Sequence, residues 1–129
     1  MKKVIIVLLV VWGAFYYVGH HYDLNDTLKW AKKNRQSPWA PKVDYYVGLI
    51  YYQRSQFGPA QEAFTQLLTD FPTAQYAPKA LIRMADAAES NLNWEAAKGA
   101  LSRYLEEYPE GQDLEIAKKR LDILKYQHP

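Results

Sequence analysis

The stretch FPTAQYAPKA, at residues 71–80, decides the fold because its pattern recurs at a fixed distance on both sides. Thirty-seven residues earlier, at 38–43, the sequence PWAPKV repeats the Ala-Pro-Lys core behind another aromatic ring. Thirty-seven residues later, Tyr108-Pro109 falls on Phe71-Pro72. Self-similarity at one period indicates stacked structural units, which predicts a solenoid.

Apolar residues inside each 37-residue unit return every three or four positions, which is the spacing of an amphipathic helix. Proline ends a helix or occupies its first turn, and Asn and Asp are favoured N-caps. These signals predict helices over 42–55, from Pro59 to Phe71, from Pro78 onward, after Asn93, after Asp113 and over Leu24–Lys33.

Two sets of residues resemble the tetratricopeptide (TPR) family, whose signature runs Trp-x2-Leu-Gly-x2-Tyr, then Ala-x3-Phe, then Pro. Asp44 and Leu81 stand where the signature has Trp, and the unit is longer than the usual 34 residues. The signature offsets are occupied by Val47, Gly48, Tyr51, Ala60, Phe64 and Pro72, and one unit later by Met84, Ala85, Ala88, Ala97, Leu101 and Pro109.

The longer unit is similar to the bacterial envelope branch of that family, which includes the TPR lipoprotein of the β-barrel assembly machinery and the Tol-associated cell-division coordinator. This resemblance implies an all-α fold of two full hairpins with flanking helices, and it places small residues (Gly48, Ala60, Ala85, Ala97) where paired helices cross. The predicted segments are a transmembrane signal-anchor helix (1–22), a juxtamembrane half-repeat (23–40), repeat 1 (41–77), repeat 2 (78–114) and a capping helix with its tail (115–129).

The N-terminal segment has the composition of a membrane anchor. Lys2 and Lys3 precede a run without charged residues that lasts to Tyr22, close to the roughly 20 residues that a spanning helix needs. No A-x-A cleavage pattern follows, so we expect an uncleaved anchor rather than a removed signal peptide. The two lysines favour a bacterial inner-membrane protein with its repeats in the periplasm, although basic residues after the segment oppose that orientation. The predicted anchor residues are Val4, Leu8, Trp12, Phe15 and Tyr16.

Composition argues against several classes of function. Residues 23–129 carry 14 basic and 14 acidic side chains, whereas nucleic-acid binders show a basic surplus. The absence of cysteine excludes disulfides, a catalytic thiol, Cys-ligated zinc and a lipid-modified cysteine. Neither an H-E-x-x-H motif nor a phosphate-binding glycine loop is present. We therefore predict no catalytic residue, no metal site and no cofactor, and a protein that is not an enzyme.

Protein binding is the activity that the resemblance implies, because first helices of TPR hairpins line a concave groove. The partner-binding positions would be Tyr45, Leu49, Tyr52, Ile82, Asp86 and Glu89. An equally weighted alternative is that the first three pack inside the domain against Leu24–Lys33. Ile116 and Ile123 form a second stripe on the last helix, which either docks a partner or is a pair of ordinary exposed apolar residues.

The sequence thus predicts a membrane-anchored TPR scaffold or accessory subunit that binds protein partners in an envelope complex. One alternative is a tethered chaperone or assembly factor that holds client peptides in its groove. Another is a subunit that contacts a pigment or haem through His20 or His21. Adjacent histidines point to different sides of a helix, so we favour the simpler interpretation that both mark the membrane interface.

Overall fold

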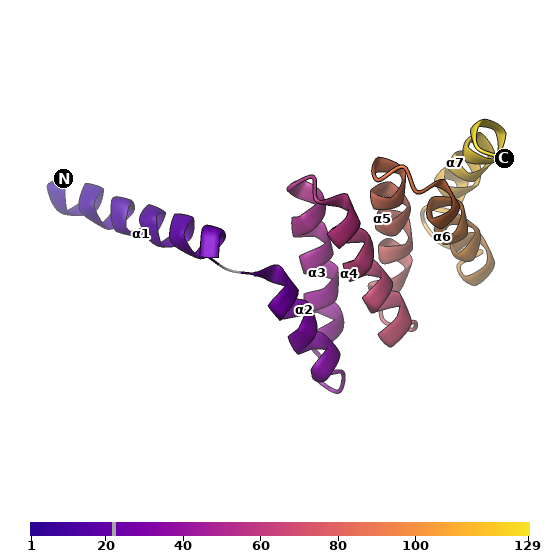
Figure 1. Cartoon of the computed structure of the whole chain (residues 1–129). Helices are drawn as coiled ribbons and strands as arrows, with labels where there is room; N and C mark the ends of the chain where they lie inside the picture. Colours follow the sequence, from indigo (N-terminus) through magenta and orange to yellow (C-terminus); the bar gives the residue numbers. More distant parts are fainter. Residues whose placement is uncertain (22) are drawn as a thin grey trace.

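The computed structural model describes residues 1–21 and 23–129, with the side chains of residues 18–21 also outside the description. The described residues form helices and no strand, which confirms the predicted all-α class. The helices are α1 (Lys2–His21), α2 (Leu24–Lys33), α3 (Ala40–Gln53), α4 (Phe57–Asp70), α5 (Ala77–Ser90), α6 (Trp94–Glu107) and α7 (Leu114–Gln127). From α2 to α7 they stack side by side in chain order, while α1 projects away from the α2 end (Figure 1).

The 37-residue period is visible in the helix starts. Helices α3, α5 and α7 each have 14 residues and begin at Ala40, Ala77 and Leu114. Helices α4 and α6 begin at Phe57 and Trp94, one period apart. We call α3, α5 and α7 the first helices and α2, α4 and α6 the second helices, because α3 pairs with α4 and α5 with α6.

Two helix starts show how proline and a polar cap act in this chain. The second helix of the first hairpin begins at Phe57, two residues before the predicted start at Pro59, because Pro59 fits within a first turn that needs no donor from it. Asn93 caps α6 as predicted, since its side chain accepts a hydrogen bond from the backbone N–H of Ala96 at 3.2 Å.

Small residues allow the paired helices to approach closely. A Cβ atom built on Gly48 of α3 would lie 2.6 Å from Cε1 of Phe64 in α4, so only glycine fits there without movement. Ala60, Ala85 and Ala97 are fully buried. The predicted close approach of paired helices is therefore confirmed at Gly48, and the three alanines are buried as predicted for a crossing.

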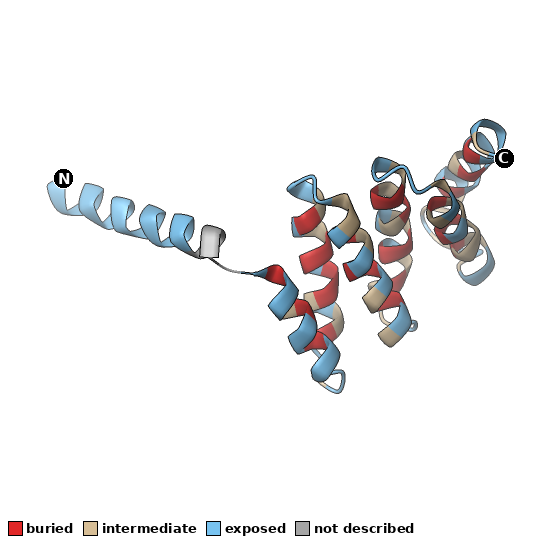
Figure 2. Cartoon of the chain, viewed as in Figure 1, coloured by how far each residue is buried: buried red, intermediate tan, exposed pale blue. Residues whose placement is uncertain are grey.

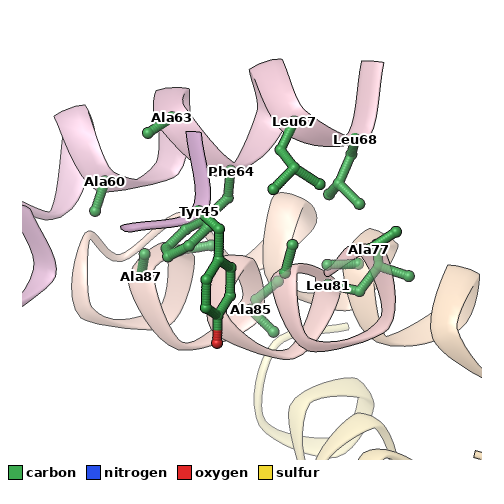
Figure 3. Close-up of a cluster of buried hydrophobic side chains, with 14 of the residues drawn as sticks. Tyr45, Ala60, Ala63, Phe64, Leu67, Leu68, Ala77, Leu81, Ala85 and Ala87 are labelled. Atoms are coloured by element: carbon green, nitrogen blue, oxygen red, sulfur yellow. The ribbon is translucent and has the colours of Figure 1, made fainter. Parts of the chain in front are cut away.

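The core runs through the stack as one layer between the first and second helices (Figure 2). Figure 3 shows Phe64 and Leu67 on the side of α4 that faces α5, where Leu81 and Ala85 lie. Each of these side chains is removed from water, and burying a leucine or phenylalanine side chain contributes roughly 1.5–3 kcal/mol.

Helix α1 lies outside this core, and its described side chains from Val4 to Tyr17 are all exposed (Figure 2). Within the described part of the chain, no helix combines the length and the apolar character that crossing a membrane requires. The transmembrane helix predicted for residues 1–22 is therefore not supported.

Candidate protein-binding surface

Tyr45 lies in the core, which corrects its predicted place in an open groove. Its side chain is only 7% exposed, and its ring stacks on Tyr76 with 5.2 Å between centroids and lies 6.1 Å from Phe64. Phe64 belongs to α4 and Tyr76 precedes α5, so neither of these ring contacts involves α2, the helix named in the alternative. The side of α3 that faces α5 is covered because successive first helices lie next to each other.

Three other predicted groove residues are partly buried. Leu49, Tyr52 and Ile82 are half-buried and pack against the core. The ring of Tyr52 meets that of Phe57 edge to face at 5.3 Å. These side chains keep part of their surface in contact with solvent.

Asp86 and Glu89, the predicted acidic rim, bind a basic residue of the same chain. Arg120 of α7 lies 2.9 Å from a carboxylate oxygen of each, while Arg83 lies 3.8 Å from Asp86. Burial raises the pKa of the Asp86 carboxyl, and the two arginines oppose that rise. The three-residue spacing of two acids on α5, with an arginine on the next first helix, was the signal that could have revealed this bridge.

Helix α7 carries three exposed apolar side chains. Ile116 is 56% exposed, Ile123 46% and Tyr126 89%. One period earlier, the position of Ile123 is held by Asp86, which contacts Arg120 of the next first helix, and two periods earlier by the half-buried Leu49. No described residue covers this side of α7. We call Ile116, Ile123 and Tyr126 the α7 strip; Tyr126 belongs to it by helical spacing and was missed in the sequence.

A buried polar cluster fixes α2 to the first hairpin. Asp44, where the TPR signature has Trp, is fully buried and accepts a hydrogen bond at 2.9 Å from Nε2 of Gln66. The same nitrogen donates to the backbone carbonyl of Leu28 in α2, also at 2.9 Å. Burial raises the pKa of Asp44 to about 7, with a smaller contribution from the negative charge of Asp70. The side-chain amide of Gln66 in α4 thus links this helix to both α2 and α3.

The remaining predicted sites lie on or near α1. Val4, Leu8, Trp12, Phe15 and Tyr16 are exposed, and Trp12 stacks on Tyr16 with 5.9 Å between ring centroids. The side chains of His20 and His21, on which the pigment or haem alternative depends, lie outside the described residues.

Comparison with known proteins agrees with this architecture. No curated protein matches the chain. The family model of the YfiO outer membrane lipoprotein matches residues 39–118, which include both hairpins and the start of α7. The match confirms the resemblance to TPR proteins of the bacterial envelope. Because it covers more than half of the 129 residues, the chain belongs to the YfiO outer membrane lipoprotein family.

Proposed function

We propose that this protein is a non-catalytic scaffold subunit of a bacterial envelope complex and that it binds a protein partner through the α7 strip. The observation that carries the proposal is the exposure of Ile116, Ile123 and Tyr126 on one side of α7. Apolar side chains grouped on a surface mark interaction sites, and tyrosine is enriched where interfaces gain most of their energy.

The repeat register supports the α7 strip over the concave positions of α3 and α5. The sides of α3 and α5 that face the following first helix are occupied within the chain, by Tyr76 and by Arg120. The corresponding side of α7 is open to an external helix. A partner helix stacked there would continue the same side-by-side packing.

The side of α7 that would pair with a second helix has a different composition. It carries Lys118, Asp122 and Lys125, all exposed. Charged outer faces are what terminal repeats use to stay soluble. The strip and this charged face therefore divide α7 into a binding side and a solvated side.

The double variant Ile116→Glu with Ile123→Glu tests the proposal. We expect the amount of partner that co-purifies at fixed stoichiometry to fall at least about tenfold, because two charges would have to be desolvated in the interface. The thermal midpoint should stay close to that of the unmodified protein, since both side chains are exposed.

The matched control is Lys118→Glu with Lys125→Glu, which changes two exposed residues on the charged side of the same helix. Retention of the partner by the control and its loss from the isoleucine variant would support the proposal. Undiminished retention by the isoleucine variant would overturn it. Capture that depends on unfolded client peptides would point to the chaperone alternative instead.

Attachment to a bilayer through α1, with the repeats in the periplasm, is the second part of the proposal. Its support is the run of exposed uncharged side chains from Val4 to Tyr17, which follows Lys2 and Lys3. A helix that is hydrophobic all round is stable only when an apolar medium surrounds it. The chain has no cysteine to carry a lipid, so α1 would take over the membrane attachment that a lipid gives in a lipoprotein.

A further inference from the structure

Helix α2 is a second helix that lacks its first helix. It packs on α3 and touches α4, as α4 packs on α5, but α1 projects away and leaves the pairing side of α2 uncovered (Figure 1). Trp30 of α2 is 44% exposed, whereas Leu67, which holds the same position in α4, is fully buried. The difference marks the place where a first helix is missing.

Residues of α3 are also more exposed than their counterparts one period later, as expected where a first helix is missing. Ile50 is 37% exposed, while Ala87, its counterpart one period later, is fully buried. Val43 is half-buried, while its counterpart Ala80 is fully buried. The side of α3 that would face a preceding first helix therefore carries apolar residues at positions that are buried in the next repeat.

Trp39 is a further residue that is exposed because no first helix precedes it. Its counterpart is Tyr76, whose ring stacks on Tyr45 of the preceding first helix at 5.2 Å. Trp39 has no preceding first helix to stack on and is 62% exposed, with the ammonium of Lys42 at 5.2 Å from its ring centroid. We call the surface formed by Trp30, Trp39, Val43 and Ile50 the open slot.

We propose that a helix from a different protein fills the open slot and completes the first hairpin. This inference rests on the proposed scaffold function and adds a second, separate docking surface at the opposite end of the solenoid. Because the first helices α3, α5 and α7 each have 14 residues, the docking segment is a helix of about four turns, or roughly 21 Å.

The slot also defines the chemistry of the docking helix. By the repeat register it would carry a small residue near its centre, where α3 has Gly48 and α5 has Ala85. It needs an apolar side to cover the two tryptophans. Acidic residues should flank that side, because residues 23–43 include five basic side chains (Lys29, Lys32, Lys33, Arg35, Lys42) and only two acidic ones (Asp23, Asp26).

Helix α1 of the same chain is a poor occupant, although one period before α3 falls on residues 3–16. A first helix keeps one side in water, and α3 and α5 carry Lys42, Gln53, Lys79 and Arg83 on exposed positions. Helix α1 has no charged residue from Val4 to Tyr17. In the slot it would leave an apolar side in water, which is unfavourable.

A second copy of the chain fits the slot poorly as well. Its α7 is the helix whose pairing side is free, but Asp122 stands at the position that Gly48 holds in α3 and Ala85 in α5. Lys118 and Lys125 lie on the same side and would approach the basic residues of α2. Burying these charges opposite like charges is costly.

Photo-crosslinking tests the inference in membranes of the natural host. A photoreactive phenylalanine analogue replaces Trp39 or Ile50 in the full chain, and Lys125 on the charged side of α7 serves as the control position. We expect adducts from positions 39 and 50, at least about tenfold above the control, that map by peptide sequencing to one amphipathic segment of another protein with a small central residue and acidic flanks. Adducts with lipid, with α1, with a second copy of the chain or at control level would overturn the inference.

The variant Ile50→Glu separates this inference from the proposed function. We expect it to lower recovery of the crosslinked protein at least about tenfold while the partner of the α7 strip stays bound. If Ile116→Glu with Ile123→Glu releases its partner but Ile50→Glu releases nothing, the scaffold function stands and the open slot does not bind a helix. If neither variant releases any protein, both proposals fail.

Discussion

Ser55 and Leu92 occupy the same place in successive hairpins and share a left-handed backbone, with φ of 59° and 57°. Each follows the last residues of a first helix. The next residue donates its N–H back to the carbonyl of Tyr51 in one hairpin and of Ala88 in the other, at 2.9 and 2.8 Å. This is the hydrogen-bond pattern of a Schellman C-cap, where glycine is the usual residue.

Replacing Leu92 with glycine should stabilise the protein. A left-handed conformation costs a non-glycine residue roughly 1–2 kcal/mol, and the Leu92 side chain is exposed, so little packing is lost. Part of the gain is offset by the greater chain entropy of glycine when unfolded, which leaves about 0.5–1 kcal/mol. Thermal or urea unfolding measures the change. The control Leu92→Ala keeps the backbone strain and should give no gain; a glycine variant no more stable than the alanine variant would contradict the explanation.

Asp44 makes stability depend on pH. Its pKa is raised to about 7 in the folded protein, from 3.8 for the ordinary group, so the folded state holds a proton between pH 4 and 7 that the unfolded state has released. Stability should therefore fall as pH rises through this range, by up to about 1.4 kcal/mol per pH unit from this group. Urea unfolding at a series of pH values measures the slope, which Asp44→Asn should reduce. An equal slope in both proteins would exclude Asp44 as its source.

At the scale of the helix, replacing glycine with alanine should have opposite effects on stability in α3 and in α6. In α3, the Cβ of Gly48→Ala would meet the buried Phe64 ring, so this change should destabilise the protein by roughly 1–3 kcal/mol. In α6, a Cβ on Gly99 meets nothing within 4 Å, so Gly99→Ala should stabilise by about 0.5–1 kcal/mol through helix propensity. Chemical unfolding of the two single variants checks both signs, and a gain from Gly48→Ala would contradict the described crossing.

Helix positions followed from the sequence because they depend on local chemistry. The bounds Leu24–Lys33 were predicted from the spacing of Leu24, Leu28 and Ala31, which are buried in α2. The cap at Asn93 was likewise a local signal. The burial of Tyr45 and the bridge from Arg120 depend on how far apart two first helices stand. Spacing within a single helix contains no information about that distance.

At the scale of the whole molecule, α1 is the one described helix that shares no core with the others. The proposed attachment to a bilayer predicts that Leu8→Lys, with a charge in the middle of the apolar run, moves the protein from the membrane to the soluble fraction. A central lysine costs about 2.5–3.5 kcal/mol in a lipid environment. Fractionation by ultracentrifugation measures the shift, with Leu8→Ala as control. A Leu8→Lys protein that remains fully in the pellet after alkaline washing would refute attachment through α1.

The neighbour-only contacts of the solenoid also bear on how such a chain changes in evolution. Each helix from α2 to α7 packs on the next one or two along the chain. Duplicating one 37-residue unit would therefore insert a hairpin between α4 and α5 without altering the residues at either end. A lineage could lengthen the distance between its two terminal surfaces in steps of one hairpin, while the partners at those surfaces encounter the same side chains as before.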